Sequence, residues 1–83
     1  MTQKFRTQDE SYVLQIYRSA IERGDVHSEL HRYEVGNKIN LHPKKVNTIC
    51  KLLLQANFIN KTSETHIVLT KHGESLALRL LAE

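Results

Sequence analysis

The residue types in this chain that can do chemistry include a closely spaced histidine pair, and its surroundings do not favour a metal site. His27 and His31 are four residues apart, so on a helix they would share one face and could hold a metal ion together. The only further ligand in reach on such a helix is Glu34, because Cys50 is expected in the core. Two surface histidines are therefore the preferred interpretation, and no metal or other cofactor is expected.

Nucleophilic and nucleotide-binding chemistry is not supported by the remaining residues. The single cysteine, Cys50, excludes an internal disulfide and lies on an apolar stripe, which predicts an inert thiol rather than a redox sensor. The three glycines, Gly24, Gly36 and Gly73, are isolated, so no phosphate-binding loop is present. Residues 73–75 lack the second glycine of a nucleophile elbow. The sequence predicts neither an enzyme nor a small-molecule binding protein.

Charge is distributed unevenly along the chain. The 83 residues carry 12 Lys and Arg against 9 Asp and Glu, a net charge of +3. Residues 35–63 contain no carboxylate, and five lysines lie among them: Lys38, Lys44, Lys45, Lys51 and Lys61. A solvated face with counterions is one interpretation of this basic segment, and a surface that faces phosphates is the other.

A helix predicted over residues 43–55 favours the phosphate-facing interpretation. At 100° per residue, one of its faces is apolar, formed by Val46, Ile49, Cys50 and Leu53. The opposite arc carries only cations, amides and a hydroxyl: Lys44, Asn47, Thr48, Lys51 and Gln55, with Lys45 at its edge. Lysine binds phosphates, while amide and hydroxyl groups can contact base edges. Because a solvated helix face normally mixes glutamate with lysine, the absence of acids favours a DNA-facing surface.

The first element that must support this surface is a helix over residues 8–23. Thr7 and Glu10 have the spacing of a capping box, and Gly24 supplies a left-handed stop. Residues 1–7 are expected to form an N-terminal arm. The apolar stripe of the helix is predicted to consist of Tyr12, Val13, Ile16, Tyr17, Ala20 and Ile21.

The segment that follows leaves two alternatives open. Val26 could enter a short strand, or Ser28 could cap an early-starting second helix that ends near Ile39. The apolar positions of that helix are expected to be Leu30, Tyr33, Val35 and Ile39. Gly36 would cost about 1 kcal/mol in an exposed helix, so the close approach of another helix is expected there.

Residues 40–57 contain a tight turn and the ends of the helix that follows it. Asn40 tolerates the left-handed conformation of a sharp turn, and Leu41 is expected to reach the core. His42 is then the N-cap and Pro43 the first residue of the helix. Asn57 is expected to end the helix in a left-handed conformation.

The C-terminal third predicts a hairpin and a closing helix. Residues 58–61 and 66–69 are β-prone and are joined by a short polar turn. Thr70 caps a helix over residues 71–82, whose leucines point in several directions and therefore favour a partner surface. The longest apolar run is three residues, far short of a membrane span, and no secretory signal is visible, so a cytoplasmic location is expected.

Two segments resemble the winged helix-turn-helix domains of bacterial, archaeal and phage transcription regulators. Residues 33–59 resemble the helix-turn-helix, and residues 67–73, Ile-Val-Leu-Thr-Lys-His-Gly, resemble the segment that closes the wing. The resemblance covers about residues 12–81. It implies one mainly α domain with a small β-hairpin (α+β), in the order helix, short strand, helix, helix, hairpin wing, helix.

The resemblance also implies a partner and a set of contacts. Helix 43–55 would be the recognition helix in a major groove of double-stranded DNA, and wing 58–69 would lie on the flanking backbone. A homodimer through helices 71–82 and 8–23 is expected. The predicted DNA-binding residues are Lys38, His42, Lys44, Lys45, Asn47, Thr48, Lys51, Gln55, Lys61, Ser63 and His66.

The sequence departs from the usual pattern of these regulators at the cap and in the wing. His42 replaces the usual hydroxyl or acid at the N-cap, and the wing carries one lysine, Lys61, rather than an arginine cluster. The alternative function is a winged-helix protein–protein interaction module of a larger complex that binds no DNA. A basic, uncovered recognition helix favours DNA binding over this alternative.

Overall fold

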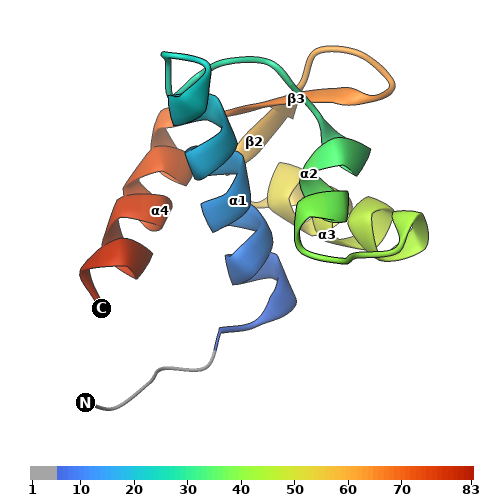
Figure 1. Cartoon of the computed structure of the whole chain (residues 1–83), viewed down its shortest axis with the longest axis horizontal. Helices are drawn as coiled ribbons and strands as arrows, with labels where there is room; N and C mark the ends of the chain where they lie inside the picture. Colours follow the sequence, from blue (N-terminus) through green and yellow to red (C-terminus); the bar gives the residue numbers. More distant parts are fainter. Residues whose placement is uncertain (1–5) are drawn as a thin grey trace.

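A computed structural model describes residues 6–83, which form four helices around a small three-stranded sheet (Figure 1). In chain order the elements are α1 (Gln8–Glu22), β1 (Leu30–His31), α2 (Arg32–Lys38), α3 (Pro43–Gln55), β2 (Ile59–Lys61), β3 (His66–Leu69) and α4 (Lys71–Ala82). This is the α+β winged helix-turn-helix order expected from the sequence. Residues 1–5 of the expected N-terminal arm lie outside the described residues. Arg6, from the same expected arm, donates from Nη2 to the carbonyl oxygen of Leu80 at 3.1 Å.

Helix α1 starts and stops where the sequence predicts, but its buried face is wider. The Thr7–Glu10 capping box is present, and Gly24 adopts a φ of 96° after the helix. Ile21, expected in the core, is 49% exposed, whereas Leu14, outside the predicted stripe, is buried. The reason is that α1 packs against α4 on one side and against α2 and α3 on the other (Figure 1). Because neighbouring helices contact α1 on two sides, they bury more of its surface than the single apolar stripe predicted from the sequence.

The segment before α2, for which the sequence allows either a strand or an early helix start, contains a strand, but Val26 is not part of it. Leu30 pairs with Ile67 and His31 with His66, so β1 joins the hairpin as a third strand. The interpretation of Ser28 as a helix cap is wrong, because its hydroxyl donates to the carbonyl oxygen of Asp25. The second helix therefore begins at Arg32, and Leu30 belongs to the strand rather than to the helix.

The sheet is antiparallel with β3 in the centre, in the order β1-β3-β2. Lys61 and Leu30 both lie opposite Ile67, so the central strand connects the wing to the segment before α2. The hairpin turn extends past the helices on the side of α2 and α3 (Figure 1). The wing and the helix-turn-helix thus share one side of the molecule.

The turn between α2 and α3 has the predicted conformation. Asn40 has a φ of 59°, Pro43 is the first residue of α3, and His42 Nδ1 accepts from the backbone N–H of Lys44 at 3.3 Å. Gly36 is needed for close packing, because a Cβ there would overlap Cγ2 of Val46. The two helices of the motif therefore meet at a position where no side chain fits.

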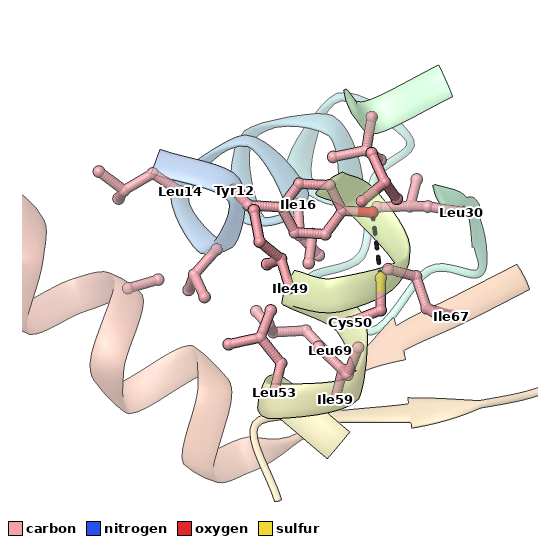
Figure 2. Close-up of a cluster of buried hydrophobic side chains, with 14 of the residues drawn as sticks. Tyr12, Leu14, Ile16, Leu30, Ile49, Cys50, Leu53, Ile59, Ile67 and Leu69 are labelled. Atoms are coloured by element: carbon pink, nitrogen blue, oxygen red, sulfur yellow. Dashed lines mark hydrogen bonds between the residues drawn. The ribbon is translucent and has the colours of Figure 1, made fainter. Parts of the chain in front are cut away.

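The core lies between the helices and the inner face of the sheet (Figure 2). A buried polar chain crosses it: Cys50 Sγ donates to Tyr12 Oη at 3.5 Å, and Tyr12 Oη donates to the carbonyl oxygen of Arg32 at 2.8 Å. These three residues belong to α3, α1 and α2, so the chain ties the three helices together. Figure 2 shows the Tyr12–Cys50 contact among the apolar side chains.

Candidate nucleic-acid interface

Helix α3 presents the arc predicted from the helical wheel. Val46, Ile49, Cys50 and Leu53 are buried, as expected. The opposite arc is exposed to solvent along the whole helix and consists of Lys44, Lys45, Asn47, Thr48, Lys51 and Gln55. We call these six residues the α3 arc. Three are lysines and none is acidic, so the arc is positively charged and rich in hydrogen-bonding groups.

One edge of the α3 arc contacts helix α2. The hydroxyl of Tyr33 donates to Oδ1 of Asn47 at 2.7 Å. Arg32 Nη2 in turn donates to the Tyr33 hydroxyl at 3.1 Å, and the guanidinium lies 5.0 Å from the centre of the Tyr33 ring. Asn47 is therefore an oriented side chain, while Lys51 and Gln55 project from the middle of the arc.

The other edge of the α3 arc borders the start of α1. Lys45 and Thr48 line a shallow hollow of about 220 Å³ together with Asp9 and Leu52. Leu52 is 53% exposed, which places an apolar group beside the lysines. Asp9 brings one carboxylate to this edge, a tertiary neighbour that an acid-free stretch of sequence cannot reveal.

Two polar side chains of α3 are already used in part by the helix itself. The hydroxyl of Thr48 donates to the carbonyl oxygen of Lys44 at 3.1 Å, so its oxygen and methyl group are what remain for a ligand. His42 caps the N-terminus of the helix and is exposed there. Its ring therefore lies at the N-terminal end of α3, next to the α3 arc.

Lys38 lies apart from the α3 arc. Its Nζ donates to the hydroxyl of Ser19 at 3.2 Å, toward α1. The two residues line a separate hollow of about 250 Å³ with Glu22 and Glu34. The structure thus groups Lys38 with α1 and two carboxylates.

The wing brings together the three residues predicted there, mostly in structural roles. The Ser63 hydroxyl accepts from the backbone N–H of Thr65 at 3.3 Å and of His66 at 3.1 Å. His66 Nδ1 lies 2.9 Å from the hydroxyl of Thr65, and its ring meets that of His31 edge-on at 5.2 Å. Lys61 is exposed, and so is Glu64 in the turn, so the wing adds little net positive charge.

Two features of this surface do not follow from the sequence pattern. The pattern predicts Tyr33 only as an apolar helix position, and Arg32 is not among the predicted site residues. Their contact with Asn47 joins residues 14 apart in the sequence, so only the packing of α2 on α3 creates it. Leu52, the first residue of the three-residue apolar run 52–54, is not among the predicted site residues either, although the 100° step between successive residues places it between Thr48 and Lys45.

The histidines and the cysteine do not form a reactive site. His27 lies in the turn before β1 with Nδ1 2.7 Å from the carbonyl oxygen of Leu69, whereas His31 lies in β1, so the two do not share a helical face. Across residues 6–83, no three His, Cys, Asp or Glu side chains gather closely enough to hold a metal ion. Burial raises the pKa of the Cys50 thiol above its ordinary value, which disfavours the reactive thiolate.

No helix in the described part of the chain has both the length and the apolar character to cross a bilayer. No known family model matches the sequence, and no curated protein matches it closely.

The structure is similar to two solved structures. One is the MarR family protein Rv2887 of Mycobacterium tuberculosis, with a TM-score of 0.69, 22% identity, and 93% of this chain and 53% of that chain covered. The other is the YusO protein of Bacillus subtilis, with a TM-score of 0.69, 24% identity, and 92% and 53% covered. The chain spans about half the length of these neighbours and shares their fold, a winged helix.

Proposed function

We propose that this winged helix-turn-helix protein binds double-stranded DNA and regulates transcription. Helix α3 enters the major groove, Lys44 and Lys51 bind phosphates or guanine edges, and Asn47, Thr48 and Gln55 contact bases. Lys45 contacts the backbone at the edge of the groove. The wing lies on the flanking backbone, where Lys61 supplies its positive charge.

The observation that carries this proposal is the exposed, acid-free α3 arc. Its three lysines are exposed on the outer face of one helix, and that helix lies on the side of the molecule to which the wing turn extends. A helix of 13 residues is long enough to follow a groove over several base pairs, since it measures about 20 Å.

The proposed DNA complex is a homodimer. Leu78 and Leu81 lie about one turn apart on α4 and are 48% and 44% exposed, which leaves an apolar strip for a second copy. Two copies would read half-sites about 34 Å apart. Sedimentation equilibrium of the full chain tests this part, and a monomer at all concentrations with and without DNA contradicts it.

The salt dependence of binding tests the proposed contact with DNA. With three to five phosphate contacts per chain, the logarithm of the binding constant should fall against the logarithm of salt concentration with a slope of about −3 to −4.5. Fluorescence anisotropy with a labelled duplex of roughly 30 base pairs, at about 50 and 200 mM salt, measures this slope. Absence of DNA binding at the lower salt concentration would contradict the proposal and favour the alternative, in which the α3 arc binds an acidic protein.

A further inference from the structure

Among the described residues, Asn47 is the only member of the α3 arc whose side chain accepts a hydrogen bond from a side chain of another helix. Tyr33 Oη donates to its Oδ1 at 2.7 Å, and Arg32 Nη2 donates to Tyr33 Oη at 3.1 Å. We call Arg32, Tyr33 and Asn47 the Tyr33 relay. Asn47 is exposed, so the relay ends at the surface that would face a base pair.

The direction of the hydrogen bonds in the Tyr33 relay follows from its first member. A guanidinium can only donate, so the Tyr33 oxygen accepts from Arg32 and its own proton is left to donate. The acceptor for that proton on Asn47 is the amide oxygen. The amide nitrogen, with its two donor hydrogens, is consequently the group left without a partner within the relay.

The backbone of Arg32 is held by hydrogen bonds at both its N–H and its carbonyl group. Its backbone N–H donates to the carbonyl oxygen of Thr65 in the wing turn at 2.8 Å, and its carbonyl oxygen accepts from Tyr12. The guanidinium also stacks on the Tyr33 ring. The relay therefore rests on the core and on the wing, and the hydroxyl that orients Asn47 has a defined position.

This arrangement restricts what Asn47 can recognise in a major groove. A bidentate pair with adenine requires the amide to turn its oxygen to N6 and its nitrogen to N7 of the same base. The hydrogen bond from Tyr33 to the oxygen opposes this rotation. A donor pointing outward instead matches guanine, which presents two neighbouring acceptors, O6 and N7, in the major groove.

We propose that Tyr33 is a positioning residue that makes Asn47 a hydrogen-bond donor toward DNA, so that the protein prefers guanine to adenine at the base that Asn47 contacts. The inference rests on the proposed function of α3, and it adds the base that one side chain selects. The preference should amount to about 3- to 10-fold in affinity, the usual effect of one hydrogen bond gained or lost.

The test uses the 83-residue chain and a pool of duplexes with a randomised core, followed by competition between duplexes that differ at one base pair. The position contacted by Asn47 is the one at which Asn47→Ala removes the preference of the wild type. There the wild type should favour guanine. Tyr33→Phe keeps the ring and its stacking on Arg32 but frees the amide oxygen, so the guanine-to-adenine ratio should fall to about one or invert.

The Asn47→Ala background is the matched control, because Tyr33→Phe should have no further effect on base choice in it. The salt slope should stay the same in Tyr33→Phe, since no charge is removed. A purely structural role for Tyr33 would weaken binding to all duplexes equally and leave the ratio unchanged, which would overturn the inference alone. An Asn47→Ala variant that keeps every base preference would also overturn it. If the wild type binds no duplex at low salt, the inference and the proposed function both fail.

Discussion

At the scale of single residues, the core contains a polar chain whose members have no reactive role. Tyr12 and Cys50 are fully buried, and burial raises the pKa of both side chains. The hydroxyl and the thiol therefore stay protonated at neutral pH and act as hydrogen-bond donors. Tyr12 supplies the partner for the carbonyl oxygen of Arg32, and that residue begins the Tyr33 relay.

Tyr12→Phe should lower the free energy of unfolding by about 1–2 kcal/mol, because the Arg32 carbonyl loses its donor. Urea denaturation followed by circular dichroism measures this value. Tyr17→Phe, a half-buried tyrosine on the same helix, is the control and should change stability by less than about 0.5 kcal/mol. Equal stabilities of Tyr12→Phe and the wild type would show that the buried chain contributes nothing.

At the scale of elements, the local signals were strong enough to predict most helix ends. Thr7, Gly24, Asn40 and Asn57 each act within a few residues, through a side-chain cap or a positive φ, and all four adopt the predicted role. The hairpin and α4 were predictable for the same reason.

The resemblance implied a short strand before α2, but the residues of β1 could not be located from local signals, because they gain their stability from pairing with β3, more than thirty residues later. The candidate site likewise has features that follow from local sequence and features that depend on tertiary packing. The exposed arc follows from the helical period of α3 alone, whereas the Tyr33–Asn47 and Lys38–Ser19 contacts depend on how the helices pack. Sequence periodicity indicates which face of a helix is exposed, but it does not indicate which neighbour touches that face.

The N-cap of α3 provides a prediction that separates stability from binding. His42 accepts from Lys44 N–H at 3.3 Å, a long bond, and Asn or Asp caps are better. His42→Asn and His42→Asp should each raise the free energy of unfolding by about 0.5–1 kcal/mol. Thermal denaturation measures this gain.

Only His42→Asp should weaken DNA binding, by roughly several-fold, because its carboxylate faces the phosphates from the end of the recognition helix. The two variants have the same shape and differ in charge, so each is the control of the other. Equal affinities in anisotropy titrations would mean that the N-terminus of α3 does not approach DNA.

At the scale of the whole molecule, charge and shape support one binding side. The net charge of +3 is modest, but the fold places helix α3, which carries the acid-free arc, on the same side of the molecule as the wing turn, while α1 and α4 pack together elsewhere. Leu78 and Leu81 of α4 are exposed, and the proposed function assigns them to a second copy. DNA and the second copy are therefore assigned to different surfaces.

The measurement that tests the central claim most directly is duplex binding by a charge-reversed α3 arc. Lys44→Glu/Lys51→Glu should weaken binding by about 100-fold or more at roughly 50 mM salt and leave the far-UV circular dichroism unchanged. The control, Arg18→Glu/Lys71→Glu, makes the same charge change at exposed positions on α1 and α4 and should retain most of the affinity. Equal binding by the two double variants would contradict the assignment of α3 as the DNA-reading helix.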